Sequence, residues 1–186
     1  MSDKTIAIVP EGDESSYDAV SLMRLPVPVT GDVLVKDGRL IDRRGRPLRD
    51  LRISVTDHCN FRCRYCMPDG GIEKCAHEDI CSLEELRDMA AAAVRCGVKK
   101  IRVTGGEPLV RRGAVDFCRM LSSIAGVEEL CVTTNGSLLK EVARPLRDAG
   151  VTHLNISLDT LNEERFRAIT RLGTLQDTCL LYTSPS

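Results

Sequence analysis

The stretch that decides the fold lies at residues 51–66 and reads LRISVTDHCNFRCRYC. An apolar segment at residues 51–55 is followed at once by a loop with three cysteines, Cys59, Cys63 and Cys66, spaced CxxxCxxC. Three thiolates at this spacing can surround one iron–sulfur cube, whose four irons take four ligands. No fourth cysteine lies in the compact part of the loop, so the pattern predicts one iron that is open to a ligand other than protein.

The composition is that of an ordinary globular domain, with 42% hydrophobic and 28% charged residues in a chain of 186. The 26 basic and 27 acidic side chains give a formal net charge of -1, which favours neither nucleic acid nor an anionic membrane as a partner. No apolar run of about eighteen residues is present, so no membrane span is expected. Nine cysteines without an export signal indicate reduced thiols in the cytoplasm, or in the mitochondrial matrix of a eukaryote.

The sequence pattern divides the chain into three parts. Residues 1–30 show no periodicity and are interpreted as a flexible N-terminal extension. Residues 31–174 form the predicted core, which begins with a hairpin around Asp37 and Gly38. Residues 175–186 form an atypical tail, interpreted as foreign to the fold and as the mark of a truncated or frame-shifted product.

Strands and helices alternate within the core, which predicts an α/β fold with a parallel sheet. Strands are expected at residues 51–55, 100–104, 130–133 and 153–158, and helices at residues 82–96, 114–124, 138–149 and from 162 onward. Ser82 and Glu85 predict a capping box on the first helix. Pro145 is expected to kink or shorten the third helix, because proline lacks the N–H of the helical hydrogen bond.

A polar segment follows each of the four predicted strands of the parallel sheet. The cysteine loop follows the first, TGGEP at residues 104–108 the second, TTNG at residues 133–136 the third and SLD at residues 157–159 the fourth. Ligand sites of parallel sheets lie at the carboxyl ends of the strands. We therefore expect these four segments to meet at one rim of the sheet.

Together, LRISVTD, the cysteine loop, Met67-Pro68 and TGGEP closely resemble the radical S-adenosylmethionine (SAM) enzymes, and among these the GTP 3',8-cyclases of molybdenum cofactor biosynthesis. The resemblance covers residues 42–173 and implies a partial (β/α) barrel of the radical SAM type, truncated here after about four β/α units. Such a fragment would lack the C-terminal half of the family. It would leave a strand edge open and is expected to be poorly soluble.

The resemblance implies a [4Fe–4S] cluster held by Cys59, Cys63 and Cys66, with SAM on the open iron. A 5'-deoxyadenosyl radical would then take hydrogen from C3' of GTP, and C3' would attack guanine C8 to give 3',8-cyclo-7,8-dihydro-GTP. The implied partners are GTP and an unidentified electron donor, with a homodimer left open. The fragment alone is expected not to complete the cyclisation.

The resemblance assigns SAM contacts to Tyr65, Gly106 and Ser157. Gly105 and Gly106 would let the backbone approach the methionine end of SAM, and Glu107 would add acceptor oxygens there. No side chain is assigned a catalytic role, because the cofactor carries the difficult chemical step.

The resemblance assigns GTP contacts to Arg52, Arg102 and Thr133. Lys100 is a further candidate, since a triphosphate needs cations at the rim, and arginine offers a bidentate fork where lysine offers a compact charge.

Two other functions remain open on the residues alone. The cysteine triplet with His58 or His77 could hold a structural zinc ion in a binding module, although TGGEP after the next strand favours the iron–sulfur interpretation. The cysteine loop and TGGEP also serve radical SAM enzymes that act on other substrates, such as peptides.

The remaining thiols and polar side chains have ordinary structural interpretations. Asp159 is a candidate cap of the helix that follows it, and His153 is expected to be a packing residue. Five cysteines are interpreted as structural thiols: Cys75, Cys81, Cys96, Cys118 and Cys131.

Overall fold

The computed structural model describes residues 33–36, 38–42, 44–68 and 80–179. The strands are β1 (Val33–Lys36), β2 (Arg39–Asp42), β3 (Asp50–Ser54), β4 (Lys100–Thr104), β5 (Glu129–Thr134) and β6 (His153–Ile156). The helices are α2 (Leu83–Arg95), the short 3-10 helix η2 (Pro108–Val110), α3 (Ala114–Ser122), α4 (Leu139–Asp148), α5 (Glu163–Thr170) and α6 (Leu175–Cys179). The predicted N-terminal extension, Cys75 and His77 lie outside the described residues.

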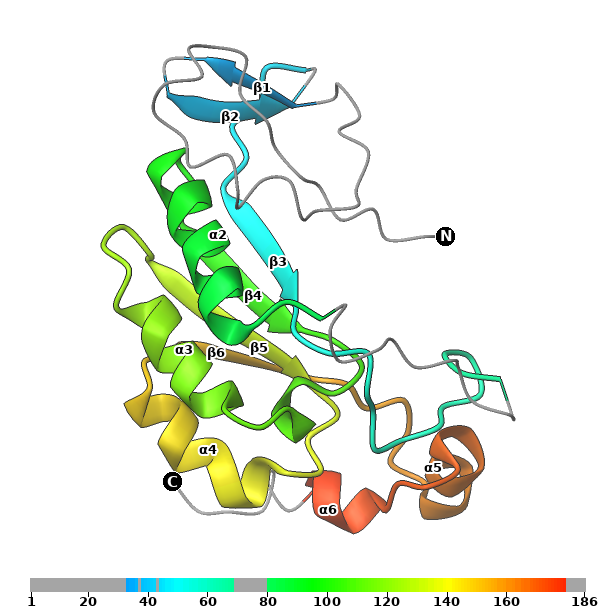
Figure 1. Ribbon diagram of the computed structural model, residues 1–186. Coiled ribbons are helices and arrows are strands. Elements are labelled where there is room, and N and C mark those ends of the chain that lie inside the picture. The colour runs from blue at the N-terminus through cyan, green and yellow to red at the C-terminus, as the bar shows by residue number, and fades with distance from the viewer. Residues whose placement is uncertain (1–32, 37, 43, 69–79, 180–186) are drawn as a thin grey trace.

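The predicted parallel sheet is confirmed. Its four strands run in the order β3-β4-β5-β6, and every neighbouring pair is parallel. One row of paired residues crosses the sheet and consists of Arg52, Arg102, Cys131 and His153. All carboxyl ends therefore lie on the same side, at the lower end of the sheet in Figure 1.

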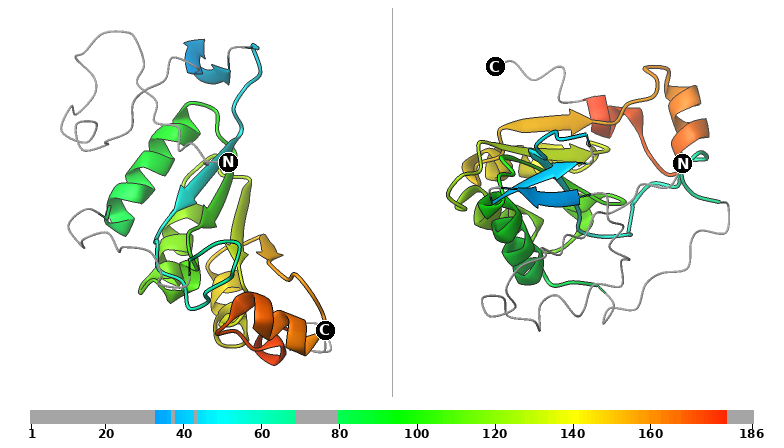
Figure 2. Two further views of the ribbon diagram at one scale, coloured as in Figure 1. Left: turned by 90° about the vertical axis from the view of Figure 1, so that its right-hand side faces the viewer. Right: turned by 90° about the horizontal axis from the view of Figure 1, so that it is seen from above.

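Helices α2, α3 and α4 cover one face of the sheet (Figures 1 and 2). Apolar side chains of the strands and of these helices share one core, which includes Ile53, Ile101, Val103, Val132, Leu86, Ala90, Phe117, Leu121 and Leu146. Phe117 is fully buried, which contributes about 2–3 kcal/mol relative to an exposed side chain. The predicted capping box of α2 is present, with Ser82 and Glu85 bonded to each other's backbone N–H groups.

The β1–β2 hairpin lies beyond the amino end of β3, away from the cysteine loop (Figure 1). Gly38 has φ of +71°, as the predicted tight turn requires. The N–H of Leu40 donates to the carbonyl of Cys96 at the end of α2. This bond attaches the hairpin to the helical layer.

Two helices bear on the predictions from the sequence. The helix predicted at residues 138–149 is confirmed as α4, which runs from Leu139 through Pro145 to Asp148 and is shorter by one residue at each end. Helix α6 places residues 175–179 in regular structure, although these lie in the range interpreted as a foreign tail. Residues 180–186 lie outside the described part of the chain. Within that part, no helix combines the length and the apolar character needed to cross a membrane.

Candidate functional site

The glycine loop after β4 is packed against the backbone of the cysteine loop. The N–H of Gly106 donates to the carbonyl of Thr56 and the N–H of Glu107 to the carbonyl of His58, both at 2.8 Å. A Cβ on Gly106 would lie 2.5 Å from His58 O, and one on Gly105 would lie 2.6 Å from Thr56 O. The glycines are therefore needed for contact between two loops of this chain, a reason that differs from the predicted approach to SAM.

Glu107 joins the loop after β4 to the loop after β5. Its side chain is 1% exposed, and its Oε1 accepts the Leu109 N–H at 3.1 Å and the Thr134 hydroxyl at 2.8 Å. Its Oε2 accepts the Asn135 N–H at 2.7 Å. Burial raises the pKa of this carboxyl group, and the three donors offset part of that effect. The predicted acceptor oxygens are thus engaged by the protein itself.

An amide and hydroxyl network links the cysteine loop to the loop after β5. Asn135 Nδ2 donates to Asn60 Oδ1 and Asn60 Nδ2 donates to the Ser137 hydroxyl oxygen, both at 2.8 Å. The Ser137 hydroxyl donates to Asn135 Oδ1 at 2.7 Å. The network and Glu107 together bring three of the four predicted loops into contact, as the sequence pattern predicts.

The three cysteines of the loop are free thiols, with Cys59 and Cys63 half-buried and Cys66 exposed. The N–H groups of Cys66 and Met67 both donate to the carbonyl of Cys63. The sulfur of Cys59 accepts the N–H of Phe61 at 3.3 Å. Burial raises the pKa of the Cys59 and Cys63 thiols, so a metal must displace their protons to bind.

Tyr65 connects the cysteine loop to the segment after β6. Its hydroxyl donates to Asp159 Oδ2 at 2.9 Å; desolvation of the hydroxyl group together with this bond raises its pKa, although most of the side chain is exposed. Asp159 thus has a partner in the cysteine loop, whereas the cap of α5 is Asn162, which corrects the predicted cap. Ser157, the third residue predicted for SAM, donates its N–H to the carbonyl of Thr134 at 2.9 Å.

The cysteine loop rests on the end of α5, which lies beside it in Figure 1. The N–H groups of Arg62 and Arg64 donate to the carbonyls of Thr170 and Ile169, each at 3.0 Å. The rings of Phe61 and Phe166 meet edge to face, with centroids 6.1 Å apart. The loop is therefore anchored by a helix about a hundred residues later in the chain.

The residues predicted for GTP share one face of the sheet. Arg52 and Arg102 are paired in register on β3 and β4, and Thr133 lies on β5. Their neighbours Ile53 and Val132 belong to the core beneath the helices, so the three side chains lie on the opposite face. A basic pair thus occupies the face that α2–α4 do not cover.

Two other predicted positions are corrected. Lys100 is the first residue of β4, at the amino end, where its Nζ lies 2.7 Å from Glu129 Oε2. It therefore lies away from the rim at which it was predicted to bind phosphate. His153 is exposed on β6 and contacts the hydroxyl of Thr152, so it is not a packing residue.

The cysteine loop fits an iron–sulfur cluster by the chemistry of its donors, because three soft thiolates from one short segment suit such a cluster. Across the described ranges, no three His, Cys, Asp or Glu side chains converge on a single ion position. A cube takes each cysteine on a different iron, so its ligands stand farther apart than those of one zinc ion. The structure therefore offers no support for a zinc site that includes His58.

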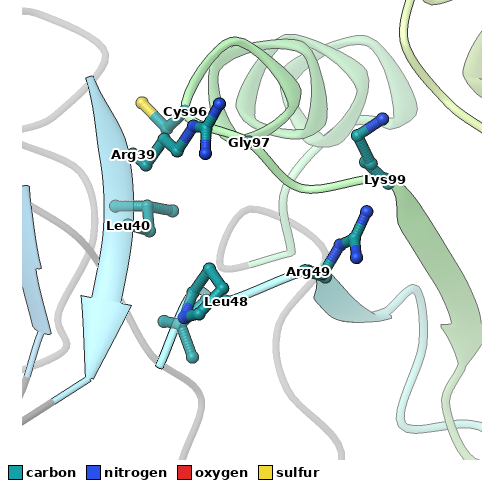
Figure 3. A pocket seen from close by; sticks show the side chains of 8 residues that line it. Arg39, Leu40, Leu48, Arg49, Cys96, Gly97 and Lys99 are labelled. Carbon is teal, nitrogen blue, oxygen red and sulfur yellow. The ribbon is translucent and has the colours of Figure 1, made fainter. Parts of the chain in front are cut away.

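A hollow of about 470 Å³ lies at the opposite end of the sheet (Figure 3). It is formed where the hairpin, the segment before β3 and the segment after α2 meet, and its lining includes Leu40, Leu48, Arg49, Cys96 and Lys99. None of the residues predicted to bind the cluster, SAM or GTP lines it. The hollow is therefore separate from the candidate site.

The loops of the candidate site were predicted from the sequence, but the side chains that connect these loops to one another were not. Asn60, Asn135 and Ser137 stand in turn-forming contexts, which offer a weak signal for side-chain hydrogen bonding. The contacts of Asp159 with Tyr65 and of Phe166 with Phe61 had no local signal, because each joins segments far apart in the chain.

Comparison with known proteins agrees with this arrangement. The Radical SAM superfamily model matches residues 53–179. The chain is 58% identical to a GTP 3',8-cyclase of Geobacter sulfurreducens and 57% identical to one of Peptoclostridium acidaminophilum, each over 137 residues. A GTP 3',8-cyclase of Pseudomonas entomophila is 52% identical over 137 residues.

These matches cover 74% of this chain but only 41–42% of the relatives. The chain thus spans less than half the length of the curated relatives that it matches. The family match extends over more than half of the chain and includes the cysteine loop, the glycine loop and α5. The chain therefore belongs to the radical SAM superfamily.

Proposed function

We propose that this chain is the part of a GTP 3',8-cyclase that binds a [4Fe–4S] cluster, SAM and GTP for the first step of molybdenum cofactor biosynthesis. The proposal is carried by one observation above the others. Arg52 and Arg102 lie in register on the sheet face that α2–α4 leave uncovered, on two strands that lead into the cysteine loop and the glycine loop. The high identity to proteins named GTP 3',8-cyclase supports the same substrate.

In this proposal Cys59, Cys63 and Cys66 hold the cluster, and an electron donor from outside the chain reduces it. When bound, the cluster supplies the single electron that cleaves the sulfonium of SAM. Tyr65, Gly106 and Ser157 contact SAM. Gly106 and Ser157 lie in the segments that directly follow β4 and β6. The N–H of Gly106 donates to the carbonyl of Thr56 and the N–H of Ser157 to the carbonyl of Thr134, and these bonds between neighbouring segments support the assignment.

Arg52 and Arg102 hold the phosphates of GTP, because two guanidinium groups can each donate a pair of hydrogen bonds to phosphate oxygens. Thr133 contributes a hydroxyl group from the next strand. The relatives are more than twice as long as the matched region, so we assign the closure of C3' onto C8 to the longer protein. The 186-residue polypeptide alone is expected to bind its ligands without forming cyclic product.

The proposal is tested by GTP binding to anaerobically reconstituted protein. Arg52→Ala and Arg102→Ala should each weaken GTP binding by about tenfold or more, because each removes a charged donor to phosphate. Arg119→Ala is the matched control, since this exposed arginine lies on α3 and pairs with Asp116. Equal GTP binding in all four proteins would overturn the assignment of GTP and favour a radical SAM enzyme with another substrate.

A further inference from the structure

Arg171 follows α5 in a backbone conformation that residues with a side chain rarely adopt. Its φ is +63° and its ψ is -40°. Within the described ranges it is the one non-glycine residue with positive φ. Such a conformation persists where surrounding contacts hold the residue in place.

The side chain of Arg171 makes those contacts with the cysteine loop. Its Nη1 donates to the carbonyl of Arg62 and to the carbonyl of Met67, both at 3.0 Å. These two carbonyls bracket the segment that contains Cys63 and Cys66. One guanidinium group therefore ties together the two ends of the segment, through charged donors that make stronger bonds than neutral ones.

The backbone of the same helix end makes the reciprocal contacts. The last carbonyls of a helix have no partner within it. Here the carbonyls of Ile169 and Thr170 accept the N–H groups of Arg64 and Arg62. The backbone groups of the cysteine loop and of the end of α5 are therefore hydrogen-bonded to each other. The side chain of Arg171 adds two further bonds, to the carbonyls of Arg62 and Met67.

We propose that Arg171 is a positioning residue, which holds the segment with Cys63 and Cys66 in the conformation that receives the iron–sulfur cluster. It acts through the carbonyls of Arg62 and Met67, to which its guanidinium group donates. The inference rests on the proposed function only in that the cluster binds to these cysteines.

Two substitutions separate the side chain from the backbone conformation. Glycine adopts positive φ without strain, so Arg171→Gly removes the donors while relaxing the backbone. Arg171→Lys keeps the strain and keeps a cation that can donate to one or both carbonyls. Arg167→Ala is the control, because Arg167 is an exposed arginine of the same helix.

The first measurement is amide hydrogen exchange of the metal-free chain. In Arg171→Gly, the amides of Arg62 and Arg64 should exchange about tenfold faster or more, because the opening of the loop loses its charged anchor. Arg171→Lys should be intermediate and Arg167→Ala should match the wild type. Core amides of β4 and β5 should be unchanged in all variants. Wild-type exchange of Arg62 and Arg64 in Arg171→Gly would overturn the proposal.

The second measurement is the electron paramagnetic resonance spectrum of the reduced, reconstituted proteins. Arg171→Gly should bind less iron per chain and give an altered spectrum, with partial recovery in Arg171→Lys. A faster-exchanging loop with unchanged iron content and spectrum would overturn the positioning role. A wild-type chain that takes up no cluster would overturn the proposed function instead, and the exchange measurement would still decide whether Arg171 anchors the loop.

Discussion

Glu107 Oε2 accepts the backbone N–H of Asn135 at 2.7 Å, which fastens the glycine loop after β4 to the turn after β5. The other carboxylate oxygen accepts two further donors, so the carboxylate completes the hydrogen bonds of two backbone N–H groups and one hydroxyl. This buried side chain therefore holds the loops of the candidate site in their relative positions.

Glu107→Gln should lower the free energy of unfolding by about 1–3 kcal/mol, because an amide NH₂ would face a donor and leave one backbone N–H unsatisfied. Urea unfolding at neutral pH measures this change. Glu141→Gln, an exposed acid in the first turn of α4, is the control and should change stability by less than about 0.5 kcal/mol. Equal effects of the two substitutions would contradict the anchoring role of Glu107.

The free energy of unfolding should depend on pH through the titration of the Glu107 carboxyl group. Burial raises the pKa of its carboxyl group in the folded state above the ordinary value of 4.5. As pH falls through the raised pKa towards 4.5, the folded state takes up the proton first, so the wild type should gain stability relative to Glu107→Gln. Urea unfolding of both proteins from pH 7 downward tests this. A relative loss of stability on acidification would mean that the three donors outweigh burial.

Cys63→Ala should abolish the visible absorbance of anaerobically reconstituted protein, because the cluster would lose one of its three protein ligands. Iron and sulfide content should fall with it. Cys96→Ala provides the control, since Cys96 follows α2 at the opposite end of the sheet. Full absorbance in Cys63→Ala, or an equal loss in Cys96→Ala, would count against the cluster site.

Gly106→Ala should destabilise the chain by about 3 kcal/mol or more and lower its iron content, because the new methyl group would overlap the carbonyl of His58. Gly45→Ala separates this steric effect from a backbone effect. Gly45 has φ of +76° and open space around it, so its substitution should cost only about 1 kcal/mol and leave iron binding intact. Thermal unfolding and iron analysis compare the two, and similar losses would refute the tight contact of the loops.

The sequence allowed the sheet and its helices to be predicted because their signals are local. Short apolar runs in the sequence predicted the positions of β3 to β6 to within a few residues. The pair Ser82 and Glu85 correctly predicted the start of α2. Pro145 was predicted to kink or shorten the third helix, which nevertheless extends three residues beyond it, to Asp148. Proline removes one hydrogen bond of the helix, and burial of Leu139 and Leu146 on either side of it supplies enough packing for α4 to continue.

The candidate site could be predicted as a set of loops but not as a set of contacts. Parallel topology brings the strand ends together whatever their side chains are, which is why the rim could be foreseen. The partner of Tyr65 is Asp159, 94 residues away, and no local pattern specifies such a pair. Lys100 was misplaced because charge alone does not distinguish the two ends of a strand, and its pairing with Glu129 follows from register.

The hydrogen bond from Arg171 to the carbonyl of Arg62 closes across 109 residues of chain. A ribosome that has just translated the cysteine loop has therefore not yet made the helix against which that loop rests. At about 5–20 residues per second, the missing segment follows roughly five to twenty seconds later. During that interval the cysteine loop has none of its bonds to α5 and Arg171, so a cluster on these cysteines should be inserted after translation of α5 and not while the loop is being made.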